Sequence, residues 1–214
     1  MEDVLDEVLE RIKPGNAERE KFSKTKEKLF EKADEVISQF DLTIKPIIVG
    51  STARGTWLSG EHDIDLFLLF PENTPREVLE EKGLEIGNKI SGGKGREQYA
   101  EHPYVNANIN GFDVDIVPCY DIKNPTKIRS AVDRSPHHQD YIKNLLNGEK
   151  KDQVLLLKKF MKGIGAYGSE LKTHGFSGYL CELLVAHLGS FQEVIENASN
   201  WGEKTIMDPE GDRT

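Results

Sequence analysis

IIVGSTARGTWLSGEHDIDLFLLF, residues 47–70, is the stretch of sequence that decides the fold. Residues 47–49 are β-branched and stop at Gly50, which predicts a short buried strand. Residues 64–70 are apolar almost without alternation, as in a central strand covered on both faces. We expect a helix to begin at Gly50-Ser51. Asp63 and Asp65 lie two positions apart where the second strand begins, so their carboxylates point to the same face of the sheet.

A third aspartate, Asp115, lies in a later apolar stretch, VDIVP. Asp113 shares its face by the same periodicity, but Asp115 is the one flanked by apolar residues inside the strand. Three carboxylates at one sheet edge repel each other strongly, and divalent cations relieve that repulsion. We therefore predict a magnesium site formed by Asp63, Asp65 and Asp115, suited to two-metal displacement at a phosphate. Asp63 and Asp65 would bridge both ions, and Asp115 would act beside one of them on the attacking hydroxyl.

Gly50, Ser51 and Arg54 supply what an incoming triphosphate needs. A glycine lets the backbone approach phosphate, N–H groups at a helix start attract anions, and an arginine adds charge-assisted hydrogen bonds. Neither a GS pair nor a DxD pair is specific alone. Their combination with strand context and a third aspartate indicates nucleotidyl transfer.

The remaining elements predict two domains. Apolar residues at helical spacing indicate helices at residues 4–12, 17–40 and 76–90, and SGGKG at 91–95 indicates a turn. Strands are expected at 104–109 and 112–119, joined by the tight turn Asn110-Gly111. After Tyr120 the pattern is helical, at 141–146, 154–164, 176–187 and 191–201. We predict an α/β domain at residues 1–135 and a mainly helical domain at 136–214, with a C-terminal end that closes no fold.

Charge and cysteine usage bound the possible partners. The net charge of −9 argues against nucleic acid at first sight, but residues 121–176 hold eleven Lys/Arg against six acids, so this segment carries +5 and the rest −14. A solvated helical surface explains that segment equally well. Cys119 and Cys181 have no zinc-like spacing and are expected to be buried reduced thiols. With no membrane-length apolar run and no secretory signal, a cytoplasmic location is the default.

The chain contains five longer phrases of note: VGSTARGTWLSGEHDIDLFLLFP, EHPYVNANINGFDVDIVPCY, SAVDRSPHH, LLLKKFMKGIGAYGSE and HGFSGYLCELL. Together with the GS and DxD pattern they resemble the polymerase-β-like nucleotidyltransferase superfamily, and within it the archaeal, class I, CCA-adding enzymes. The resemblance covers nearly the whole chain. The resemblance implies an α+β fold with a mixed sheet and helices, followed by a mainly helical second domain. It also implies template-independent addition of C, C and A to tRNA 3′ ends from CTP and ATP, with Mg²⁺ held by the three acids. Asp63 stands where many relatives carry Glu, which keeps a carboxylate.

The same resemblance assigns nucleotide contacts. The residues that match such positions are Ser51, Arg54, Ser135, His138, Lys158 and Tyr167. Ser135 and His138 match contacts to ribose and to base or phosphates, although Ser135 is Thr in some relatives, and Lys158 and Tyr167 match triphosphate contacts. From residue chemistry alone, Lys158 could equally be an ordinary surface lysine, and the pair His137-His138 favours structural or hydrogen-bonding histidines over metal ligands.

Family members continue into further C-terminal domains that hold the tRNA acceptor stem. We therefore expect the chain to correspond to the N-terminal part only, with weak or absent tRNA binding. One alternative keeps the chemistry and changes the acceptor, as in a poly(A) polymerase, an oligoadenylate synthetase or a small-molecule nucleotidyltransferase. Another is a catalytically inert RNA-binding module on the same fold. The sequence sets no oligomeric state.

Overall fold

A computed structural model describes residues 2–169, 173–202 and 204–208. The chain divides into two compact units. The first, which we call the sheet unit, is Pro14–Asp140, and the second, the helical unit, comprises Met1–Lys13 and Tyr141–Thr214.

The sheet unit is built on five strands in the order β1-β2-β5-β4-β3. Their bounds are β1 Lys45–Val49, β2 Asp63–Phe70, β3 Arg96–Tyr99, β4 Pro103–Ile109 and β5 Phe112–Tyr120. β2 and β5 run parallel, whereas the other neighbouring strands are antiparallel, so the sheet is mixed, as predicted. Its helices are α2 Asn16–Ile37, α3 Gly50–Arg54, α4 Arg76–Ile90, the short 3-10 turn η1 Pro125–Lys127 and α5 Arg134–Lys143, whose last three residues pass into the helical unit.

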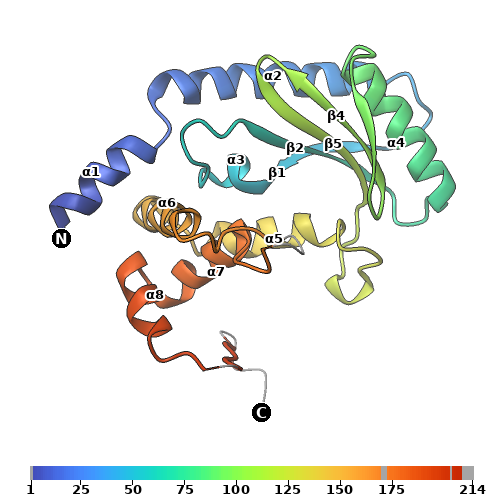
Figure 1. Cartoon of the computed structure of the whole chain (residues 1–214). Helices are drawn as coiled ribbons and strands as arrows, with labels where there is room; N and C mark the ends of the chain where they lie inside the picture. Colours follow the sequence, from blue (N-terminus) through green and yellow to red (C-terminus); the bar gives the residue numbers. More distant parts are fainter. Residues whose placement is uncertain (1, 170–172, 203, 209–214) are drawn as a thin grey trace. The chain divides into compact units, whose positions relative to one another are not determined.

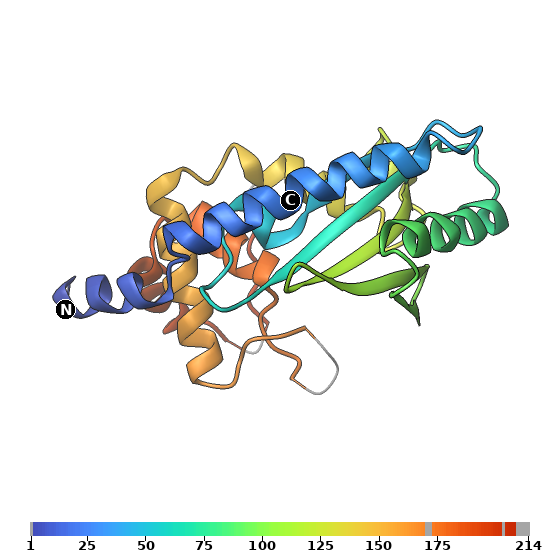
Figure 2. The ribbon, with the colours of Figure 1, turned by 90° about the horizontal axis from the view of Figure 1, so that it is seen from above.

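Helices α2 and α4 cover one face of the sheet, as both views show (Figures 1 and 2). The core on that face joins Leu29 of α2 and Leu79 of α4 to Leu66 of β2 and Ile116 of β5. A smaller cluster, containing Phe67, lies on the opposite face. Because β2 contributes buried side chains to both clusters, its unbroken apolar sequence follows directly, and the prediction of a central strand is confirmed.

The helical unit contains α1 Glu2–Ile12, α6 Gly148–Gly163, α7 Gly178–Leu188 and α8 Phe191–Ala198. Its core is formed by apolar residues of α6, α7 and α8 together with Ile142. Helix α1 contacts α6, and the Lys13 ammonium lies 2.6 Å from Asp152. Residues 2–13 therefore pack with α6, although chain order placed them in the first predicted domain. The domain bounds 1–135 and 136–214 themselves stay a prediction.

Three secondary-structure expectations differ from the structure. Strand β3 was not predicted, because all four of its residues are exposed and show no apolar alternation. Helix α5 begins at Arg134 and ends at Lys143, before the predicted 141–146 segment is complete. Helix α6 begins six residues before the predicted 154, because the Asn147 side chain caps it by accepting a hydrogen bond from the Lys150 N–H at 2.9 Å. No helix in the described ranges is both long and apolar enough to span a membrane.

Candidate active site

Gly50 and Asp65 lie against each other at the end of β1. Register pairs Val49 of β1 with Asp65 of β2, and Gly50 follows at once with φ +77°, a conformation that side chains rarely adopt. A Cβ on Gly50 would lie 2.1 Å from the Asp65 Oδ2 atom. Only glycine therefore fits beneath this carboxylate, which explains the glycine of the GS pair structurally.

The parallel pairing of β2 with β5 sets the predicted acids side by side. Asp65 is in register with Asp115, and Asp63 is in register with Asp113. Asp63 is exposed, whereas Asp65 and Asp115 are half-buried. Residues two apart on a strand share a face, so all four carboxylates lie on one face at the start of β2. The proximity of Asp63, Asp65 and Asp115 expected from the sequence thus has a structural basis in this register.

Asn106 on β4 belongs to the same cluster and was not predicted from the sequence. Its Nδ2 donates to Asp113 Oδ1 at 2.6 Å and to Asp115 Oδ1 at 2.8 Å. Register places Asn106 directly beside Asp115. An amide nitrogen has two donors, so one side chain serves both carboxylates. The available signal was an asparagine in the strand that precedes Asp113 and Asp115. Recognising it as their neighbour, however, requires the register between β4 and β5.

Burial and mutual repulsion raise the proton affinity of the two inner acids. Burial, then the charges of Asp115 and Asp63, raises the pKa of Asp65 to about 6, with Arg54 acting in the opposite direction. Burial likewise raises the pKa of Asp115, partly offset by the hydrogen bond from Asn106. Ionising both groups at neutral pH is unfavourable in the protein alone, and a nearby cation would reverse that penalty.

The donor set fits a hard divalent cation. Carboxylate oxygens are its preferred protein ligands, and the carboxylates here repel one another without it. Within the part of the chain that the structure describes, no three His, Cys, Asp or Glu side chains are arranged to hold a metal ion. The role of Asp63, Asp65 and Asp115 as metal ligands accordingly stays a prediction.

Two hydrogen bonds connect the predicted nucleotide-binding elements of the sheet unit. Arg54, the last residue of α3, donates from Nη1 to Gln139 Oε1 of α5 at 3.1 Å. Asp133, just before α5, accepts from the Tyr120 N–H at the end of β5 at 2.9 Å. Helix α5 is thus hydrogen-bonded to α3, and the residue just before α5 is hydrogen-bonded to the end of β5. Ser51 is half-buried on α3, and the half-buried Ser135 and His138 lie in the first half of α5.

Lys158 and Tyr167 belong to the helical unit, where the structure brings them together. A Cβ on Gly178, the first residue of α7, would lie 2.9 Å from the Tyr167 hydroxyl and 3.3 Å from Lys158 Nζ. Lys158 is only 2% exposed, so it is not the ordinary surface lysine that residue chemistry allowed. Its ammonium lies 3.5 Å from the fully buried Glu182 Oε1. The sequence analysis missed Glu182, although a lone acid in the apolar run of α7 was a signal.

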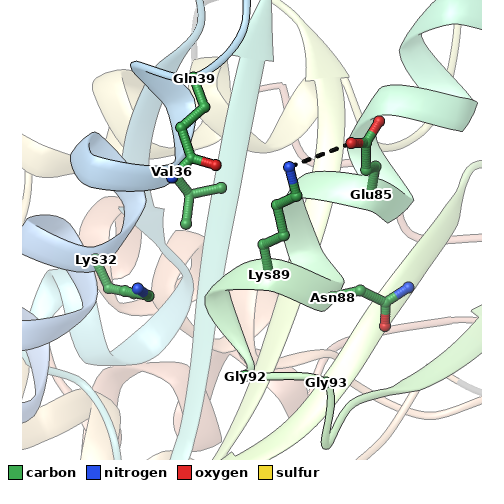
Figure 3. A pocket seen from close by; sticks show the side chains of 8 residues that line it. All are labelled: Lys32, Val36, Gln39, Glu85, Asn88, Lys89, Gly92 and Gly93. Atoms are coloured by element: carbon green, nitrogen blue, oxygen red, sulfur yellow. Dashed lines mark ion pairs between the residues drawn. The ribbon is translucent and has the colours of Figure 1, made fainter.

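The sheet unit also has a groove of about 630 Å³ between α2 and α4 (Figure 3). Its lining residues are Lys32, Val36, Gln39, Glu85, Asn88, Lys89, Gly92 and Gly93. The Lys89 ammonium within it pairs with Glu85 at 3.3 Å. None of the predicted site residues lines this groove, so it is separate from the aspartate cluster.

Two family models match the chain. The model described as "Nucleotidyltransferase domain" matches residues 30–138, and the model described as "tRNA nucleotidyltransferase, second domain" matches residues 152–214. The first match contains the whole aspartate cluster, and the second contains Lys158 and Tyr167.

Curated relatives are similar over almost the whole chain. The CCA-adding enzyme of Thermococcus gammatolerans is 49% identical over 212 residues, covering 98% of this chain and 46% of its own length. That of Methanosarcina acetivorans is 48% identical, covering 94% and 44%, and that of Halobacterium salinarum is 45% identical, covering 96% and 45%. The chain thus spans about half the length of the curated relatives it matches.

Solved structures with low sequence identity share the fold. A cytoplasmic RNA terminal U-transferase superposes with a TM-score of 0.60 at 16% identity, covering 86% of this chain and 50% of that one. CdnC of E. coli with ATP superposes with a TM-score of 0.62 at 19% identity, covering 88% and 67%. These likenesses concern the arrangement of the chain and not the reaction.

Proposed function

This chain belongs to the nucleotidyltransferase domain family, and on that premise we propose that it carries out template-independent addition of C, C and A to the 3′ ends of tRNA from CTP and ATP. The predicted fold, a mixed sheet with helices of the polymerase-β-like kind, is confirmed. The observation that carries the proposal is the register of Asp65 with Asp115 beside Gly50, in a chain 45–49% identical to CCA-adding enzymes.

Divalent metal use is general in this family, and we propose Mg²⁺ here, held by Asp63, Asp65 and Asp115. The ion would supply positive charge at the reacting phosphate and lower the cost of ionising the attacking hydroxyl. Asp115 lies between Asp65 in register on β2 and Asn106 on β4, which suits a group that orients the 3′-hydroxyl of the RNA. Its contact with Asn106 favours the charged carboxylate that this role needs.

Nucleotide contacts are proposed within each unit by itself. In the sheet unit, the Ser51 hydroxyl and the Arg54 guanidinium of α3 would donate hydrogen bonds to the nucleotide. Ser135 and His138 of α5 would contact its ribose and its base or phosphates. In the helical unit, Lys158 and Tyr167 would contact the triphosphate. Their proximity to the same residue, Gly178, supports a shared role. An acceptor tRNA with CTP and ATP also implies a cytoplasmic site of action.

Labelled CTP and ATP, supplied with Mg²⁺ and a tRNA that lacks its 3′-terminal CCA, test the proposal. We expect two C residues and then one A to be added, slowly because tRNA binding by this chain is expected to be weak, and no addition with Asp65→Ala. Incorporation of ATP alone into any RNA would instead indicate a poly(A) polymerase or oligoadenylate synthetase activity. Nucleotide affinity that responds neither to Mg²⁺ or Mn²⁺ nor to Asp65→Ala would indicate an inert RNA-binding module.

A further inference from the structure

We propose that Glu182 is a positioning residue that holds the buried ammonium of Lys158 ready for the phosphates of the incoming nucleotide. The inference rests on the proposed function, because it assigns a role within the same nucleotide site. Glu182 is not among the residues that the sequence motifs single out for nucleotide contact. It acts only through Lys158.

The first observation is burial. Lys158 is 2% exposed and Glu182 is fully buried, and the two face each other from adjacent helices, α6 and α7. Glu182 is the one acid of α7, in an otherwise apolar stretch, CELLVA. Charges are buried at large cost unless they are paired, and removing one partner leaves the other uncompensated. A chain that only needed a packed helix interface would do as well with two apolar side chains here.

The second observation is the geometry around the ammonium. Lys158 Nζ lies 3.5 Å from Glu182 Oε1, at the long limit of a hydrogen bond, so the carboxylate supplies mainly charge. Nζ also lies within 3.3 Å of the point where a Gly178 Cβ would be, and the Tyr167 hydroxyl within 2.9 Å of it. The ammonium is therefore fixed next to Tyr167 and Gly178 by a carboxylate on one side.

The third observation is electrostatic. Burial raises the pKa of the Cys181 thiol to about 11, and the charge of Lys158 lowers it while that of Glu182 raises it. The charges of Lys158 and Glu182 therefore both lie close enough to the Cys181 thiol of α7 to affect it. A lysine held in such a place loses little conformational entropy when an anion binds, unlike a mobile surface lysine. Pre-organisation of this kind is what a nucleotide-binding cation needs.

Glu182→Gln tests the proposal, because it removes the charge and keeps the shape. Affinities of the 214-residue chain for CTP and ATP are measured by calorimetry at pH 6, 7.5 and 9, with melting temperatures for each variant. We expect about tenfold weaker nucleotide binding at pH 7.5. The loss should be larger at pH 9 than at pH 6, since burial without a counter-charge favours the neutral amine at high pH. Glu196→Gln, an exposed acid of α8, is the matched control and should bind normally.

A double variant separates positioning from packing. If Glu182 acts through Lys158, Glu182→Gln should weaken binding no further in a Lys158→Met background. Additive losses, a loss equal at pH 6 and pH 9, or wild-type affinity in Glu182→Gln would each overturn the proposal. Should Glu182→Gln fail to fold, Glu182→Asp keeps the charge but withdraws it by one methylene, and wild-type affinity there also overturns it. A wild-type chain that binds neither nucleotide refutes the proposed function and this inference together, whereas normal wild-type binding with an unaffected variant refutes the inference alone.

Discussion

Replacing Asp65 by Asn is expected to stabilise the metal-free protein while abolishing nucleotidyl transfer. Burial and the neighbouring acids raise the pKa of Asp65 from 3.8 to about 6. A shift of about two units corresponds to about 3 kcal/mol at most, since each unit is worth about 1.4 kcal/mol. Asparagine keeps the size of the side chain and carries no charge, so the ionisation penalty disappears with the carboxylate.

The pH dependence follows from the sign of this shift. Below pH 3.8 Asp65 is protonated in both the folded and the unfolded chain, and it costs nothing. As the pH rises from 3.8 to 6, the unfolded chain releases this proton first, so the free energy of unfolding of the wild type falls. Above the folded pKa the loss is complete. The advantage of Asp65→Asn is therefore expected to be small at pH 4, about 0.5 kcal/mol, and largest at pH 7 and above.

Urea denaturation in EDTA at pH 4, 5, 6 and 7 measures this difference, with Asp41→Asn as a matched exposed control that should change stability by less than about 0.5 kcal/mol. Adding Mg²⁺ should stabilise the wild type through binding to the folded state and leave Asp65→Asn unchanged. A variant no more stable than the wild type at pH 7, or equally stabilised at pH 4, would refute the electrostatic reasoning about the cluster.

Three further outcomes are expected. Asp115→Asn should abolish nucleotidyl transfer and leave the melting temperature within a few degrees of wild type, because it removes charge and not core volume. Near-normal incorporation of CTP would show that Asp115 is not a catalytic residue. Gly50→Ala should destabilise the chain by about 1–3 kcal/mol in urea titrations and impair nucleotide binding. Gly60→Ala, at φ +83° but with nothing near its Cβ, should show the backbone strain alone. Equal effects of the two substitutions would contradict the steric argument. Cys119 and Cys181, both free and buried with raised pKa values, should resist a thiol reagent in native buffer and react only on unfolding, which rapid native labelling would contradict.

Local patterns in the sequence predicted most of the elements and the face shared by Asp63 and Asp65. The period of two along a strand is a local property. The positive φ of Gly50 and its close contact with Asp65 became visible only in the structure. The buried state of the two cysteines also followed from their apolar surroundings and is confirmed. Strand β3 was not predicted because none of its side chains is buried, and burial of one face is what produces an apolar alternation in the sequence.

The resemblance to a family, more than the residues themselves, singled out Ser135, His138, Lys158 and Tyr167. A histidine, a lysine or a tyrosine in a helical pattern has many ordinary explanations. The structure added that Lys158 is buried, a fact that its position beside the exposed Lys159 conceals. Its partner on α7 lies 24 residues further along the chain, beyond the reach of any helical period.

The sequence by itself determined that the chain holds a GS pair where a short strand ends, a pair of acids on one strand and a third acid on another. Only the tertiary structure decided that Asp65 stands in register with Asp115, that Asn106 joins it from β4, and that Glu182 faces Lys158. The physical reason is that periodicity assigns each side chain to a face of its own element, whereas the partner it meets depends on strand register and helix packing, which the hydrophobic burial of the whole unit selects.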